Sequence, residues 1–213
     1  MGKLDWDHNL YYHRLLLRQL PRSCDQVLEV GCGAGAFATR LAGRAGHVDA
    51  MDRSPVMIEA ARRTVPANVR CILADVLAEP LPDDTYDAIV SVTALHHLPL
   101  EKALPRLARA LRPGGILAAV ALPRTDLPRE LPVELAGAVG HRALGATFKG
   151  LRAAGGRDWL AIPEGHDLMP VADADLTTRQ VRQRAAALLP GAQVRRLVFW
   201  RYLLRWRRPI ATQ

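Results

Sequence analysis

The chain has 213 residues, 49% of them hydrophobic, and this size and composition predict one globular domain rather than a disordered chain. Its three cysteines have no CxxC spacing, which argues against a disulfide framework and a zinc site, so no metal is expected. The longest apolar run near a strand, residues 116–122, is too short to cross a membrane, and no secretion signal is evident, so we expect a cytoplasmic protein.

The net charge of +8 is unevenly distributed along the chain. Residues 1–122 are nearly balanced, with 14 basic and 13 acidic side chains, whereas residues 123–213 carry 15 basic and 8 acidic ones. Three of the 29 basic residues are lysine and the rest are arginine. Two interpretations stay open: a coding bias towards arginine, or an acidic partner such as a substrate carboxylate, a phosphate or RNA.

The first part of the chain alternates helices with short apolar strands. A helix is predicted over residues 8–20, where apolar residues recur at helical spacing and Pro21 follows. Ser54 and Pro55 are typical of the cap and first turn of another helix, which reaches Arg63. The strands expected here are 27–30, 47–52, 69–75 and 86–92, and a further helix is expected at 36–42.

The pattern then changes. A helix over residues 100–112 leads through a Pro-Gly-Gly turn into a fifth strand at 116–122, whereas residues 124–170 have weak periodicity and suit a lid or insertion. The last elements expected are a helix at 177–189 and strands at 193–200 and 201–206.

Alternation along the last strand would place Arg205 and Arg207 on one face and Leu204 and Trp206 on the other. We therefore expect a solvated basic face on a sheet edge, where charge discourages edge-to-edge pairing.

The alternation of short apolar strands with helices along the chain predicts an α/β, doubly wound fold. We expect a mostly parallel seven-stranded sheet with helices on both faces and an antiparallel C-terminal strand.

Three glycines, Gly31, Gly33 and Gly35, stand between the first strand and the helix that follows it. Glycine lets the backbone turn sharply and lets a ligand lie against it, although a tight turn with nothing bound would look the same. The spacing departs from the dinucleotide fingerprint GxGxxG, because Ala36 stands at the third glycine's place, and Glu29 precedes the loop.

With this glutamate, the segment EVGCGAG resembles motif I of class I (Rossmann-like) S-adenosylmethionine-dependent methyltransferases of the small-molecule, methyltransferase type 11-like kind. The order of later segments is similar too: VDAMD, CILAD, YDAIVSVTALHHLP and LARALRPGGILAAV. The resemblance covers about residues 25–122. It implies S-adenosyl-L-methionine as cofactor and in-line methyl transfer to a small molecule. We expect no DNA or membrane partner, and a monomer or homodimer. The acceptor is expected to be a small molecule rather than RNA, and the basic C-terminal part suggests that it is acidic.

The resemblance also implies a division of the single domain 1–213. Residues 1–24 would form a cofactor-covering helix and residues 25–122 the cofactor-binding core. A variable substrate or lid region would follow at 123–176, and residues 177–213 would form the last helix and two strands.

The same resemblance assigns roles to residues of the core. Asp52 would accept hydrogen bonds from both ribose hydroxyls, and the glycines would admit the methionine end of the cofactor. Glu29 would hold the cofactor's ammonium or orient the loop, while Asp75 and the Val76 amide would contact adenine. The implied cofactor-binding set is Glu29, Gly31, Cys32, Gly33, Gly35, Asp52, Arg53, Met57, Asp75, Val76, Ser91 and Tyr11. Met57, Asp75, Tyr11 and Cys32 could instead have purely structural roles.

The candidates on the acceptor side are fewer. His96 and His97 follow the fourth strand, and His97 aligns with the more regular histidine of the family pattern. A histidine could take a proton from a hydroxyl or amine nucleophile, or it could be structural. As neighbours at a helix start, the two are not expected to face the donor together. His166 and Met169 are further substrate candidates in the variable region.

Three other functions are compatible with parts of the sequence. The basic C-terminal part suggests an RNA methyltransferase, but SVTALHH is not the Asn/Asp-Pro-Pro-aromatic run used on flipped bases. A cofactor-binding protein that has lost its activity would keep the same motifs. A nicotinamide-dependent oxidoreductase comes last, because its glycine spacing differs.

Overall fold

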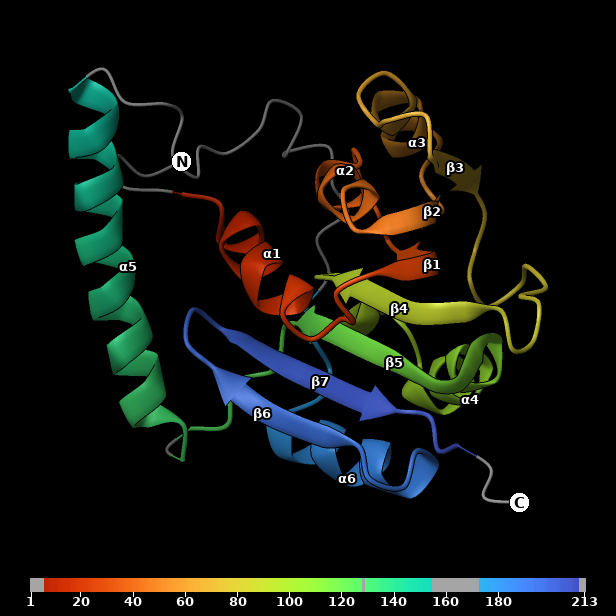
Figure 1. Cartoon of the computed structure of the whole chain (residues 1–213). Helices are drawn as coiled ribbons and strands as arrows, with labels where there is room; N and C mark the ends of the chain where they lie inside the picture. Colours follow the sequence, from red (N-terminus) through yellow and green to blue (C-terminus); the bar gives the residue numbers. More distant parts are fainter. Residues whose placement is uncertain (1–5, 128, 155–172, 211–213) are drawn as a thin grey trace.

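The computed structural model describes residues 6–127, 129–154 and 173–210, which form a central sheet with helices on both faces (Figure 1). The sheet has seven strands in the order β3-β2-β1-β4-β5-β7-β6. In chain order the strands are β1 (Cys24–Val30), β2 (Ala45–Asp52), β3 (Val69–Leu73), β4 (Tyr86–Val92), β5 (Leu111–Ala121), β6 (Gln193–Leu197) and β7 (Arg201–Arg207).

The strands from β1 to β5 pair in parallel, whereas β7 is antiparallel to both β5 and β6. The predicted sheet, with its antiparallel C-terminal strand, is therefore confirmed. The chain builds outwards from β1 to β3, then returns to place β4 on the other side of β1. Open α/β sheets bind ligands beyond the carboxyl ends of their strands at such a reversal of strand order.

Two apolar layers hold the helices to the sheet. On one face Leu16, Leu41 and Ile58 are buried in a shared core cluster, and on the other face Leu104 and Ala185 are buried. Burial of the central strands on both faces explains their nearly continuous apolar sequences. The helical elements are α1 (His8–Leu17), α2 (Ala36–Ala42), α3 (Pro55–Arg62), the 3-10 turn η1 (Leu95–His97), α4 (Leu100–Ala110), α5 (Leu131–Ala153) and α6 (Thr178–Leu188).

The helix starts read from the sequence agree with the structure. The Ser54 hydroxyl accepts a hydrogen bond from the Met57 amide, and Pro55 opens α3. At the start of α6, Thr177 and Gln180 form a reciprocal capping box. In both places a short polar side chain satisfies an amide that the helix leaves without a partner.

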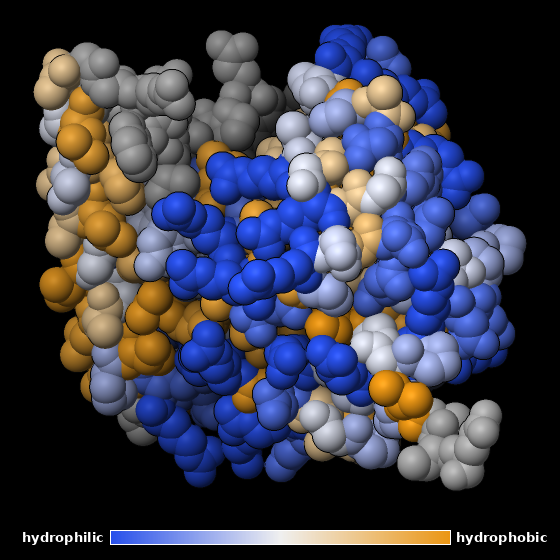
Figure 2. All heavy atoms as spheres, in the orientation of Figure 1, coloured by the Kyte–Doolittle hydropathy of each residue, from blue (hydrophilic) through white to orange (hydrophobic). Residues whose placement is uncertain are grey.

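The region expected to have weak periodicity contains α5, a helix of 23 residues. Leu131, Leu135 and Val139 recur every four residues but are 46–68% exposed, and Figure 2 shows the apolar column at the edge formed by α5. Other apolar residues of α5, Leu144 and Phe148, pack against the core, so apolar side chains lie on both sides of the helix and no single apolar stripe stands out in the sequence. None of the described helices, α5 included, combines the length and apolarity needed to span a membrane.

The last two strands differ from expectation in their positions. Leu204 and Trp206 are buried and Arg207 is exposed, as alternation predicts, but β7 lies inside the sheet and β6 forms the edge. The expected basic face on an edge is therefore wrong for β7. The residue at its beginning, Arg201, is buried instead.

Candidate functional site

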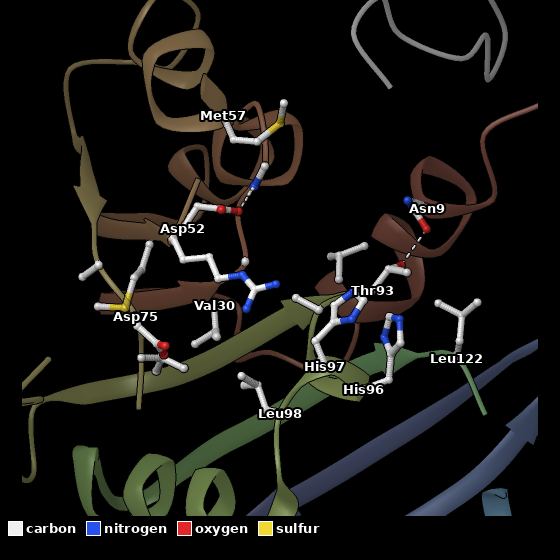
Figure 3. Close-up of a pocket in the computed structure, with 18 of the residues that line it drawn as sticks. Asn9, Val30, Asp52, Met57, Asp75, Thr93, His96, His97, Leu98 and Leu122 are labelled. Carbon is white, nitrogen blue, oxygen red and sulfur yellow. Dashed lines mark hydrogen bonds between the residues drawn. The ribbon is translucent and has the colours of Figure 1, made fainter. Parts of the chain in front are cut away.

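A cavity of about 320 Å³ opens at the carboxyl ends of the parallel strands (Figure 3). Its wall draws on α1, on the segments that end β1 to β5, on η1, on α3 and on the start of β7. The lining residues are Asn9, Val30, Gly31, Gly33, Met51, Asp52, Arg53, Met57, Ala74, Asp75, Val76, Val92, Thr93, Ala94, His96, His97, Leu98, Leu122 and Arg201.

The glycine loop forms the part of the wall that follows β1. Gly31 has φ +76°, and its amide donates to the Met51 carbonyl at 2.8 Å. A Cβ on Gly31 would lie 2.2 Å from the Cβ of Ala94, so no side chain fits there. Gly33 also lines the cavity, whereas the space beside Gly35 is occupied by Val65. Bare backbone at Gly31 and Gly33 therefore fits close approach of a ligand.

Asp52 joins this loop to the end of β2. One carboxylate oxygen accepts the Gly33 amide at 2.9 Å, and the other accepts the Ser54 amide at 2.9 Å. Each carboxylate oxygen has a second lone-pair direction, so the group can still accept hydrogen bonds from a ligand. The two amides fix the carboxylate at the cavity wall, and this arrangement fits a diol such as the ribose of a nucleoside.

Three further predicted contacts lie beyond β2 and β3. Asp75 and Val76 line the cavity, and one Asp75 carboxylate oxygen accepts the Leu77 amide at 2.8 Å. Met57 is 4% exposed and also contributes to the cavity wall, so it is both a buried packing residue and a surface available to a ligand. Arg53 lines the cavity as well and is exposed.

Five members of the predicted cofactor-binding set do not line the cavity: Glu29, Cys32, Gly35, Ser91 and Tyr11. Glu29 is 1% exposed, and its burial and the nearby Asp52 charge raise its pKa well above the usual value. Its carboxyl lies near Asp52 and the Ala38 amide of α2, outside the cavity lining, which favours the loop-orienting role over direct contact with a ligand. Tyr11 packs edge-on against Trp6 and Phe199 instead.

Both histidines of η1 line the cavity, with ring centroids 4.0 Å apart (Figure 3). The 3-10 turn directs both side chains towards one cavity, and the expectation that they do not face the donor together stays a prediction. Burial, with His97 and Arg201 nearby, lowers the pKa of His96 to about 3. Burial and Arg53 also lower the pKa of His97.

Sequence reasoning missed a polar group formed by Asn9, Thr93 and Arg201. The Asn9 side-chain oxygen accepts the Thr93 hydroxyl at 2.6 Å and an Arg201 N–H at 3.2 Å. Thr93 has φ +56°, an unfavourable conformation for a β-branched residue. These residues lie more than eighty positions apart, so no local motif could have revealed the group.

Two further predictions concern the variable region and metal binding. The substrate candidates His166 and Met169 lie outside the described residues. Within the described part of the chain, no three His, Cys, Asp or Glu side chains gather in a way that could hold a metal ion.

Comparison with known proteins identifies the family to which this chain belongs. Residues 27–115 match the family described as "Methyltransferase domain". An uncharacterized methyltransferase of Mycobacterium tuberculosis is 34% identical over 210 residues, which cover 96% of this chain and 98% of that protein. The chain therefore belongs to the methyltransferase family, and the predicted class I S-adenosylmethionine-dependent enzyme is confirmed.

Solved structures support the same fold. An S-adenosylmethionine-dependent methyltransferase from Mesorhizobium loti has a TM-score of 0.62 at 18% identity, covering 92% of this chain and 96% of that one. The complex of DhpI with SAH has a TM-score of 0.61 at 21% identity, covering 93% and 82% of the two chains.

Proposed function

We propose that this enzyme transfers the methyl group of S-adenosyl-L-methionine to a small-molecule acceptor within the cavity. The observation that carries the proposal is the division of the cavity wall: the glycine loop, Asp52 and Asp75 lie on one side, and Asn9, His96 and Leu122 on the other (Figure 3). When bound, the cofactor supplies a methyl group already activated on a sulfonium.

The donor side has the features that a nucleoside with an amino-acid tail requires. Asp52 is held in place to accept from ribose hydroxyls, and Gly31 and Gly33 leave backbone exposed to the tail. Asp75 and Met57 supply an acceptor and an apolar surface for the base. Glu29 orients the loop from outside the cavity lining. Alignment of two reactants in such a site can supply roughly 7–11 kcal/mol of the barrier reduction.

His97 is proposed as the proton acceptor when the nucleophile is a hydroxyl or an amine. Its lowered pKa keeps the ring neutral at pH 7, and a neutral imidazole can take a proton. His96, which is more deeply buried, lies beside Arg201 and is proposed to shape the acceptor side.

The cavity volume also supports a small acceptor. The volume of about 320 Å³ has to hold the donor as well as the acceptor, which leaves little space for a large acceptor inside the cavity.

The direct test is incubation of the enzyme with isotopically methyl-labelled donor and an extract of the source organism, followed by mass spectrometry. We expect label in the low-molecular-mass fraction with wild type and none with Asp52→Ala. Label confined to RNA would contradict the proposal and would indicate an RNA methyltransferase instead.

A further inference from the structure

Arg201 is a cation in the cavity wall whose hydrogen-bond partners are neutral. The residue is 8% exposed, and its Nη1 donates to the Phe199 and Trp200 carbonyls, both at 3.3 Å. Its Nη2 donates to Asn9 at 3.2 Å. Within residues 6–127, 129–154 and 173–210, no carboxylate lies within 4.0 Å of Arg201, and its buried Nε has no acceptor.

A second arginine of the same hairpin has the partners that Arg201 lacks. Arg196, on β6, is 13% exposed at its side chain and pairs with Glu130 at 3.2 Å and with Glu134 at the start of α5. The chain therefore supplies two carboxylates to one poorly exposed arginine and none to the other.

Burying a charge without a counter-charge costs several kcal/mol. Burial lowers the pKa of Arg201 to about 10, so the guanidinium still carries its charge at pH 7. Asp7 is close enough to favour that charge, but its carboxylate accepts the Asn9 and Leu10 amides as the cap of α1. No carboxylate of the described residues forms an ion pair with the Arg201 guanidinium, so this position in the cavity wall suits a bound anion.

The surroundings of Arg201 hold it at the cavity. Phe199 and Trp200 have φ +54° and +57°, conformations that cost of order 1–3 kcal/mol each for residues other than glycine. This strained turn aims two carbonyls at the guanidinium. On the other side, Thr93 fixes the Asn9 oxygen that Arg201 contacts.

The position of Arg201 in the sheet favours the acceptor rather than the donor. β7 lies three strands from β1, and adjacent strands are about 4.8 Å apart, so the start of β7 is about 14 Å from the glycine loop. Asn9, which contacts Arg201, lies across the cavity from Asp52 and Asp75 (Figure 3).

We propose that Arg201 binds a carboxylate of the methyl acceptor, an inference that rests on the proposed function. The planar guanidinium fork matches the geometry of a carboxylate. One carboxylate also balances one buried cation, whereas a phosphate, at about −1.5 to −2, would bring excess charge. His96 beside it is neutral and adds no competing positive charge.

The test uses the full chain with S-adenosylhomocysteine and pairs of probes that differ in charge: benzoate with benzamide, and succinate with succinamide. With saturating S-adenosylhomocysteine, the carboxylates should raise the melting temperature of wild type and the amides should not. In Arg201→Gln the affinity for carboxylates should fall about 10-fold or more. Arg201→Lys should retain part of it.

The matched control is Arg207→Gln, an exposed arginine on the same strand, which should bind carboxylates like wild type. S-adenosylhomocysteine should bind Arg201→Gln with wild-type affinity, which also shows that the variant is folded. A selective loss of S-adenosylhomocysteine affinity would assign Arg201 to the donor and overturn the inference. Equal responses to acids and amides, no response to any acid, or a response to inorganic phosphate alone would overturn it too. Failure of wild type to bind S-adenosylhomocysteine would instead contradict the proposed function itself.

Discussion

Asp52 is the residue on which donor binding should depend most, because its carboxylate both faces the cavity and holds the Gly33 and Ser54 amides. Asp52→Ala removes the acceptor for the ribose and releases the loop. We expect at least a tenfold rise in the Kd for S-adenosylhomocysteine, measured by calorimetry, since hydrogen bonds to charged groups contribute about 1.5–3 kcal/mol. Asp83→Ala, an exposed acid outside the cavity, is the matched control, and equal affinities for the two variants would contradict the assignment.

His97 can be separated from His96 by kinetics. If His97 accepts a proton in the transition state, His97→Ala should lower kcat by about 100-fold and leave the Kd of the donor unchanged. His96→Ala should affect the KM of the acceptor more than kcat, because His96 lies beside Arg201. A joint fall in melting temperature and donor affinity for His97→Ala would show a structural role instead.

Buried His13 makes stability depend on pH. Burial, and then the Arg40 charge, lower its pKa from 6.5 to about 3, so the unfolded chain binds one more proton between these values. The stability from the neutral ring is complete above about pH 6.5 and is lost as the pH falls towards 3. At pH 5 the loss is about 2 kcal/mol. Urea unfolding should show this slope in wild type and a weaker one in His13→Leu; an unchanged slope would contradict the interpretation.

At the scale of elements, the sequence predicts the glycine loop after β1 but not which neighbouring residues pack against it. Gly31→Ala places a Cβ 2.2 Å from Ala94 at positive φ, and we expect a loss of about 2 kcal/mol or more and a melting temperature lower by about 5 °C. Gly150→Ala, in α5 with open space around it, should be neutral or stabilising by up to about 1 kcal/mol. Equal melting temperatures for the two variants would contradict this account.

Secondary structure was predictable wherever one local rule dominated. The parallel strands show continuous apolar runs, and Ser54 and Thr177 mark helix starts by capping. The helix α5 was missed because its apolar residues lie on both sides, some exposed and others packed against the core, which blurs the helical period. On the donor side, Asp52 and Asp75 were found because they belong to short local segments, VDAMD and CILAD, that resemble motifs of the family. Arg201 was missed because its burial depends on a turn and on contacts with α1, which no window of sequence contains.

At the scale of the whole molecule, much of the basic C-terminal part is used internally. Arg196 pairs with Glu134, Arg184 pairs with Glu101 at 2.8 Å, and Arg208 donates to the Arg109 carbonyl at 2.9 Å. Among the basic residues of β6 and β7, Arg195 and Arg207 are exposed to solvent, whereas the others are buried or half-buried. The excess charge is therefore a poor guide to a polyanionic partner.

RNA binding should accordingly be weak. A fluorescent single-stranded RNA of 20 nucleotides should show no saturable anisotropy change at physiological salt, and any binding at low salt should vanish as salt is added. Arg195→Gln with Arg207→Gln should remove what remains at low salt. Tight binding that survives physiological salt would revive the RNA methyltransferase interpretation.

The position of β7 between β5 and β6 has a consequence for a chain made from its N-terminus on the ribosome. Domains can begin to fold during synthesis, and the residues from Gly31 to Leu122 emerge long before Arg201. The donor half of the cavity is thus encoded early and the acceptor half is completed by the last strand. A nascent chain that ends before β7 would hold the residues for the cofactor but lack the cation proposed to hold the molecule to be methylated.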